Sequence, residues 1–327
     1  MRRIRHVKRP VRDLVSATLL RRLTFANIVA NVVIVVTGGA VRLTASGLGC
    51  PTWPRCTDES YTTTAEMGVH GVIEFGNRLL TFVLVLIAGA TLLAALAHRP
   101  RRRGVVPLAV AVVLGIVAQA VIGGITVRTQ LHPSIVGIHF VVSMLLLLAA
   151  YALWRRVVEP DGRLVSVVPS ALRALVWITV VVSAAVVLVG VAVTGSGPHA
   201  GDADAVRNGL DPQTISQIHA DLVFLLVGLT VGLWLALRAV GAPARAVRAA
   251  LVLLLVELAQ GVIGFVQYFT NLPVLLVGLH MLGACLVWLA TLAALWSTRT
   301  AGPARSDAPP PHQPTDHEVV AAAHPAG

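Results

Sequence analysis

Long apolar stretches separated by short polar loops dominate this chain. Eight of them are long enough to cross a lipid bilayer, which takes about 20 apolar residues each. They cover residues 23–41, 71–97, 105–127, 134–154, 174–194, 213–237, 249–268 and 273–297. Because a bilayer core offers no water to backbone groups, each stretch is predicted to form a helix. The pattern therefore predicts an all-α integral membrane protein with eight transmembrane helices.

The second half of the chain repeats the first at an offset of 141 residues. Residues 119–140 (QAVIGGITVRTQLHPSIVGIHF) align without a gap with residues 260–281 (QGVIGFVQYFTNLPVLLVGLHM), and nine of 22 positions are identical. A repeat of four helices restores the original orientation in the membrane. We therefore predict two parallel four-helix halves, residues 23–155 and 156–298, related by a pseudo-twofold axis along the membrane normal.

Basic residues gather at one end of the predicted bundle. Of the 26 Lys and Arg residues, 21 lie in an N-terminal arm (1–22), in alternate loops and in a C-terminal tail (299–327), whereas the other loops hold four. This bias predicts a cell-membrane protein with both termini in the cytoplasm. It also explains the net charge of +11 without nucleic acid as a partner. The Pro-rich polar tail is predicted to be disordered.

Three histidines recur at matched depths in the predicted helices: His139, His219 and His280. Each follows a proline at the start of its helix by six or seven residues, which places it about 10 Å into the helix. Polar side chains inside a membrane usually serve function, and neutral imidazole is a common axial ligand of heme iron. The fourth matching position carries Glu74 and Asn77. The pattern predicts one heme site in each half, while copper, which favours Met and Cys ligands, is the alternative.

The second predicted helix places a polar stripe on one face. His70, Glu74, Asn77 and Thr81 are spaced by three or four residues, so they are neighbours on a helix. Glu74 has two interpretations: it faces a bound substrate, or it forms an ion pair with Arg78 at i+4. The sequence alone leaves both open.

The chain has three cysteines, two of them in the first predicted outer loop, GLGCPTWPRC. The outer face of a membrane permits disulfides, so Cys50 and Cys56 are predicted to form one. Metal binding is the competing interpretation, although two Cys without a nearby His fall short of a zinc ligand set. Cys285 lies inside the last predicted helix and is expected to be a buried packing residue.

Several motifs together resemble the heme A synthase family, over residues 23–297. They are TGGAVRLTASGLGCPTWPRC around the first loop, IEFGNRLL in the second helix, QAVIGGITV with GIHF, QIHAD, and QGVIGF with GLHM. The resemblance implies an enzyme that oxidises heme O to heme A by converting the C8 methyl group to formyl, with oxygen from water.

Residue by residue, the resemblance implies heme b as cofactor on His219 and His280, and heme O as substrate on His139. It also implies Glu74 as the catalytic carboxylate and a disulfide between Cys50 and Cys56. Many members of the family carry His where this chain has Asn77. Either Asn77 or His70 is therefore the expected second contact to the substrate iron. Expected partners are heme O synthase, terminal oxidase under assembly, membrane lipid and a second copy of this chain.

Two other functions fit parts of the pattern. A di-heme b electron carrier shares the buried histidines but predicts two complete ligand pairs, which Asn77 interrupts. A transporter with internal repeats predicts helices broken near the membrane midplane, and the apolar stretches show no proline there.

Overall fold

The computed structural model describes residues 15–100 and 102–301, and nearly all of them are helical. The helices are α1 (Ala17–Leu43), α2 (Gly68–Ala97), α3 (Val105–Arg128), α4 (Pro133–Val158), α5 (Ser170–Ser196), α6 (Pro212–Ala239), α7 (Ala244–Phe269) and α8 (Val274–Ser297). A short 3-10 turn, η1 (Ala65–Met67), precedes α2. Each predicted span is confirmed as a helix that is long and apolar enough to cross a membrane. The chain is therefore an all-α, multi-pass membrane protein.

Capping groups carry some helices beyond the apolar stretches. α1 begins six residues before its predicted span, because Ser16 Oγ accepts a hydrogen bond from the Leu19 backbone N–H at 3.2 Å. Residues 17–22, predicted to belong to the basic arm, are thus helical. Residues 1–14 of that arm and 302–327 of the predicted disordered tail lie outside the described residues.

The loops gather at two ends of the bundle. We call one the capped end; it carries residues 44–67, 129–132, 197–211 and 270–273. The other, the basic end, carries residues 98–104, 159–169 and 240–243. Among the described residues the longest loops, 44–67 and 197–211, both lie at the capped end.

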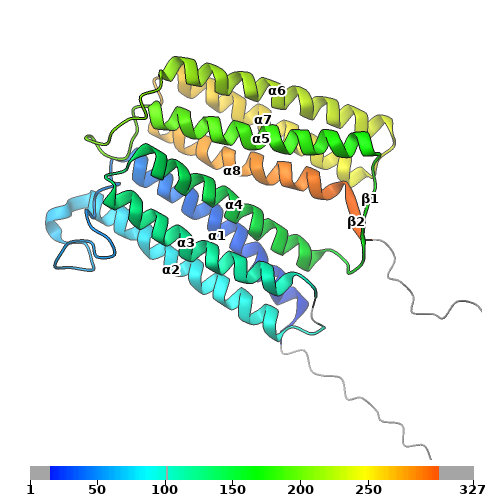
Figure 1. The fold of residues 1–327 in the computed structure, drawn as a ribbon, viewed down its shortest axis with the longest axis horizontal. Coiled ribbons are helices and arrows are strands. Elements are labelled where there is room, and N and C mark those ends of the chain that lie inside the picture. Colours follow the sequence, from blue (N-terminus) through cyan, green and yellow to red (C-terminus); the bar gives the residue numbers. More distant parts are fainter. Residues whose placement is uncertain (1–14, 101, 302–327) are drawn as a thin grey trace, which may run out of the picture.

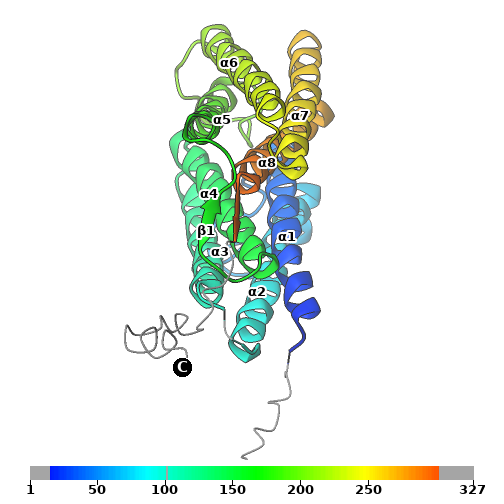
Figure 2. The ribbon, with the colours of Figure 1, turned by 90° about the vertical axis from the view of Figure 1, so that its right-hand side faces the viewer.

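Each half of the chain forms its own ring of four helices. In the first half α1 and α3 each pack against α2 and α4, and in the second half α5 and α7 each pack against α6 and α8. The two rings meet along α1 and α4 on one side and α5 and α8 on the other (Figures 1 and 2). This pattern of neighbours is the same in both halves, while the symmetry axis along the membrane normal stays a prediction.

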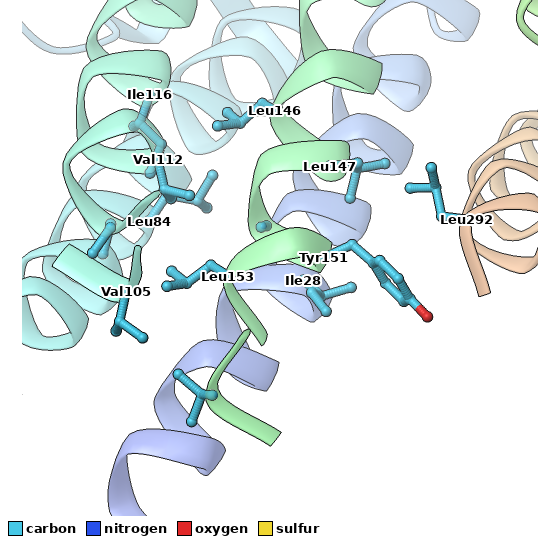
Figure 3. Close-up of a cluster of buried hydrophobic side chains, with 14 of the residues drawn as sticks. Ile28, Leu84, Val105, Val112, Ile116, Leu146, Leu147, Tyr151, Leu153 and Leu292 are labelled. Atoms are coloured by element: carbon cyan, nitrogen blue, oxygen red, sulfur yellow. The ribbon is translucent and has the colours of Figure 1, made fainter. Parts of the chain in front are cut away.

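A continuous apolar core fills the first ring and reaches into the second. Ile116 of α3 and Leu147 of α4 are almost completely buried in it. Figure 3 shows Leu147 and Tyr151 of α4 directed toward Leu292 of α8. Since lipid tails are as apolar as these side chains, close packing and not water exclusion holds the two rings together.

A small strand pair closes the basic end. β1 (Leu164–Ser166) runs antiparallel to β2 (Arg299–Ala301), with Leu164 opposite Ala301 and Ser166 opposite Arg299. The prediction that the tail is disordered from residue 299 is therefore wrong for its first three residues. The ladder with β1 supplies the backbone partners that an isolated polar tail lacks.

Candidate functional site

The three membrane histidines lie near the capped end, and each ring packs against a glycine of the preceding helix. A Cβ placed on that glycine would crowd the ring Cε1 atom: Gly123 at 3.3 Å from His139, Gly190 at 3.0 Å from His219 and Gly264 at 3.2 Å from His280. The glycines thus set how closely each imidazole approaches the neighbouring helix.

Asn77 takes the matching place in α2. It faces Gly38 of α1, where an added Cβ would lie 3.8 Å from Asn77 Nδ2. Thr37 Oγ1 donates a hydrogen bond to Asn77 Oδ1 at 2.8 Å, so the side-chain oxygen already has a partner. The amide nitrogen of Asn77 lies toward Gly38 of α1.

The second ring brings two imidazoles together. The ring centroids of His219 and His280 are 6.5 Å apart, with their planes at 67°. Two imidazoles that bind one metal ion from opposite sides need roughly 6 Å between centroids, given metal–nitrogen distances of about 2 Å. Among the described residues neither Nδ1 atom has a hydrogen-bond partner, although both are buried. The pair therefore fits the two axial positions of an iron porphyrin.

The first ring has one imidazole where the second has two. His139 Nδ1 is also buried without a partner in the described part of the chain. Gln119 Nε2 donates to the His139 carbonyl at 3.1 Å, as Gln260 Nε2 donates to the His280 carbonyl at 2.7 Å. The backbones of α4 and α8 are thus fixed in the same way, and only the side chains that face them differ.

Glu74 lies three residues before Asn77 on α2 and is 6% exposed. Its Oε1 atom accepts from Arg78 Nη2 at 2.5 Å, which is the i+4 ion pair that the sequence allowed. Its Oε2 atom accepts from the backbone N–H of Cys50, also at 2.5 Å. Arg78 in turn donates to the carbonyl oxygens of Cys50, Thr52 and Arg55. Both oxygens of Glu74 are therefore held, one by its own helix and one by the outer loop.

The loop that clamps Glu74 is itself closed by a disulfide. Cys50 and Cys56 are bonded, which confirms the predicted bridge. Trp53, between them, packs so tightly on α3 that a Cβ on Gly124 would come within 2.3 Å of its ring. Arg128 of α3 donates to the Trp53 carbonyl oxygen at 3.1 Å. The loop is thus fixed over the first ring from two helices. Cys285 is buried and free, as predicted.

His70 lies farther toward the capped end than the other candidate ligands. It is seven residues, or about 10 Å, before Asn77 along α2. Its side chain is exposed, and its Nδ1 atom lies 2.9 Å from Ser46 Oγ. The structure therefore places His70 beside the loop after α1, whereas Asn77 lies at the depth of the membrane histidines.

Sequence reasoning missed two features of this region. Gly123 and Gly264 lie in the repeated motifs and Gly190 does not, and in all three cases only the packing shows the contact with an imidazole ring. A second buried carboxylate, Glu257 of α7, is 3% exposed and was passed over. Its signal was present as a single acid in the apolar run LVLLLVELAQGVIG.

Comparison with known proteins agrees with the sequence motifs. A family model described as COX15-CtaA, cytochrome oxidase assembly protein, matches residues 21–292. The heme A synthase of Geobacillus kaustophilus is 30% identical over 122 residues, which cover 37% of this chain and 38% of that protein.

Two further relatives give the same result. The heme A synthase of Geobacillus thermodenitrificans is 31% identical over 152 residues, 44% of this chain and 47% of its own length. That of Listeria monocytogenes serovar 1/2a is 28% identical over 137 residues, 42% and 45% respectively. The matched stretches thus span less than half of each relative. The family model, in contrast, covers most of the chain from α1 to α8, and the chain belongs to the COX15-CtaA family of cytochrome oxidase assembly proteins.

Proposed function

We propose that the protein is a heme A synthase, which oxidises the C8 methyl group of heme O to a formyl group and so produces heme A. The relatives above carry that name, although they match this chain over less than half of their length. The observation that carries the proposal is the inequality of the two rings. One offers two facing imidazoles, whereas the other offers one imidazole, an amide and a buried carboxylate.

This inequality suits a permanent cofactor in one ring and a passing substrate in the other. His219 and His280 would hold heme b through its iron, with two protein ligands. Heme O would have His139 as its one imidazole ligand in the first ring, so it would be held less firmly and could leave as product. When α2 and α6 are aligned so that Asn77 matches His219, Glu74 corresponds to Ser216. A carboxylate at this position of the helix therefore occurs in the substrate ring and not in the cofactor ring.

The substrate half-reaction is R–CH3 + H2O → R–CHO + 4 H⁺ + 4 e⁻, with the formyl oxygen taken from water and the four electrons passed to an electron acceptor outside this chain. When bound, heme b supplies one-electron transfer. Glu74 is the proposed proton acceptor, and its Oε2 atom is the position that takes the proton. Arg78 holds Oε1 and so fixes the orientation of the carboxylate.

The outer loop completes this arrangement. The Cys50 N–H donates to Glu74 Oε2, so movement of the loop and exposure of the proton-accepting atom are linked. The disulfide and Trp53 keep the loop close to the ring and limit the entry of bulk water.

The setting of the enzyme follows from the charge distribution. We place the protein in the cell membrane with the basic end and both termini in the cytoplasm, because Lys and Arg concentrate there. Both porphyrin sites then lie toward the outer face. The proposed chemistry needs heme O synthase as supplier and terminal oxidase as consumer, and the chain is expected to meet both within the lipid, as a monomer or with a second copy.

Analysis of the bound hemes tests the proposal. The purified protein is converted to pyridine hemochromes, and the extracted hemes are separated by chromatography. Heme B together with heme O or heme A is the expected result. Heme B alone, at two per chain, would instead identify a di-heme electron carrier.

A further inference from the structure

A second carboxylate is buried in the middle of the second ring. Glu257 lies halfway along α7 and is 3% exposed. Thr230 Oγ1 of α6 donates a hydrogen bond to Glu257 Oε1 at 2.9 Å. The other oxygen, Oε2, is buried without a partner in the described part of the chain. An ionisable group at this depth is costly and calls for a functional explanation.

The fold itself does not need an acid at this place. At the repeat offset of 141 residues, which aligns His139 with His280, Glu257 corresponds to Ile116 of the first ring. At the offset that aligns Asn77 with His219, Thr230 corresponds to Ala88 of the first ring. Ile116 and Ala88 are both buried apolar side chains. The same packing frame is thus filled by hydrocarbon in one ring and by a hydrogen-bonded carboxylate in the other.

Glu257 lies on α7, the helix against which the His280 ring packs. Gly264, against which the His280 ring packs, is seven residues farther on, or about 10 Å. Leu253, one turn in the opposite direction, is completely buried in the apolar core of this ring. Along α7, Glu257 therefore lies between the part that contacts His280 and the part that packs in the apolar core.

We propose that Glu257 is a proton-binding site that responds to the charge of the iron between His219 and His280. Glu257 takes up one proton when the iron accepts one electron, and it releases the proton when the electron leaves: Fe(III) + e⁻ + –COO⁻ + H⁺ → Fe(II) + –COOH. In the proposed function the electron comes from the methyl oxidation described above, and in the experiment below it comes from dithionite. The inference rests on the proposed porphyrin site of the second ring but not on the formyl chemistry.

No charged group of the neighbouring helices pairs with Glu257 in the described part of the chain, so an iron bound between His219 and His280 would be its main electrostatic neighbour. α7 packs against α6 and α8. The titratable or charged groups of these three helices are His219, Asp221 and Arg238 on α6, His280 and Cys285 on α8, and Arg245, Arg248 and Tyr268 on α7. Within the described residues none of them forms an ion pair or hydrogen bond with Glu257. A unit change of charge about 10 Å away alters proton affinity on the order of tenfold.

The midpoint potential of heme b measures this coupling. Wild-type protein in lipid nanodiscs is titrated with dithionite at several pH values across the neutral range. A tenfold change in proton affinity shifts a one-electron potential by about 59 mV in total. Glu257→Gln and Glu257→Ile, the latter copying Ile116, should abolish the shift. Asp161→Asn removes an acid at the basic end and should leave the shift unchanged.

Infrared difference spectra of reduced minus oxidised protein provide a second readout. Wild type should gain a carboxylic C=O band on reduction, and Thr230→Val should move that band without removing it. Equal pH dependence and equal bands in wild type and Glu257→Gln, with an intact heme b spectrum, would overturn this inference alone. Wild-type protein without any heme b would overturn the porphyrin site as well.

Discussion

The two rings of this protein share a packing frame and differ in chemistry. In both, a glutamine fixes the backbone of the last helix, and a glycine faces each position that points into the ring. The polar side chains that face the interior differ between the rings: Asn77 corresponds to His219, Glu74 to Ser216, and Ile116 to Glu257. We infer from this comparison that the shared frame sets the place of a bound group, while single substitutions decide between the proposed cofactor and substrate roles.

The rings also differ in how their outer loops are held. The loop of the first ring is closed by a disulfide and clamped to α2 through Glu74 and Arg78. The loop of the second ring relies on hydrogen bonds from Arg207 and Asn208 to backbone carbonyl oxygens. The more firmly held loop thus covers the first ring, for which we propose the reaction with water.

Replacing a histidine should reveal the largest difference between the two rings, in the heme that each variant retains. His280→Ala deprives the second ring of one of two ligands, so bound heme b should be almost completely lost from the purified protein. The affinity loss should exceed the roughly 10–100-fold that follows removal of a group supporting a ligand. His139→Ala should retain heme b and lose heme O binding. Equal loss of heme b in both variants, measured by absorbance, would remove the distinction between cofactor and substrate rings.

Glu74→Gln addresses the chemistry of the first ring. The amide keeps the shape of the side chain but cannot accept a proton, so heme A formation should fall by about 10²–10⁴-fold while heme b remains. Heme O should accumulate in the extract. Glu66→Gln, which changes an exposed acid of η1, is the matched control and should retain activity. Heme A production at the wild-type rate in Glu74→Gln would reduce Glu74 to the ion-pair partner of Arg78.

The facing glycines allow a smaller, structural test of the comparison. Gly190→Ala brings a methyl group to 3.0 Å from His219, so it should destabilise the heme-bound protein by about 1–3 kcal/mol. Gly38→Ala meets Asn77 only at 3.8 Å, and alanine favours helices by about 1 kcal/mol. It should be neutral or stabilising. Thermal unfolding of both variants, followed by heme absorbance, measures the difference; equal loss would mean that the glycines do not set the ring clearance.

The smallest expected effect concerns pH at the start of α6. Asp211 accepts hydrogen bonds from Thr214, which lower the pKa of its carboxyl below the ordinary value of 3.8. Its contribution to stability is therefore complete above that value and is lost as pH falls through the lowered pKa. α2 has no such side-chain cap. In wild type, amide hydrogen exchange in the first turn of α6 should become faster relative to its intrinsic rate as the pH falls. In Asp211→Asn, which lacks the titrating group, the stability of this turn should not depend on pH.

The helices and the histidine positions could be predicted from sequence, because hydropathy and spacing determine them locally. The eight apolar stretches are long enough to leave no alternative to helices, and the repeated His139 and His280 share one motif. The disulfide followed from two cysteines in one short loop.

Contacts between distant segments could not be predicted in this way. The Cys50 N–H that holds Glu74, the Ser46 contact of His70 and the pairing of β1 with β2 all depend on how helices meet in space. The sequence permitted the pair between Glu74 and Arg78 but gave no reason to prefer it, since an i+4 spacing suits a salt bridge and a shared site equally well.

The strand pair at the basic end has a consequence for how the protein is made. β1 leaves the ribosome before α5, but β2 follows only after α8, so the whole second ring must be inserted before the two strands meet. Until then Leu164 and Val165, both largely exposed, border an open strand edge of the kind that attracts other chains. The ladder thus acts as a closing seam that forms last during synthesis, and a chain that stops at residue 298 would have all eight helices and still present an unfinished edge.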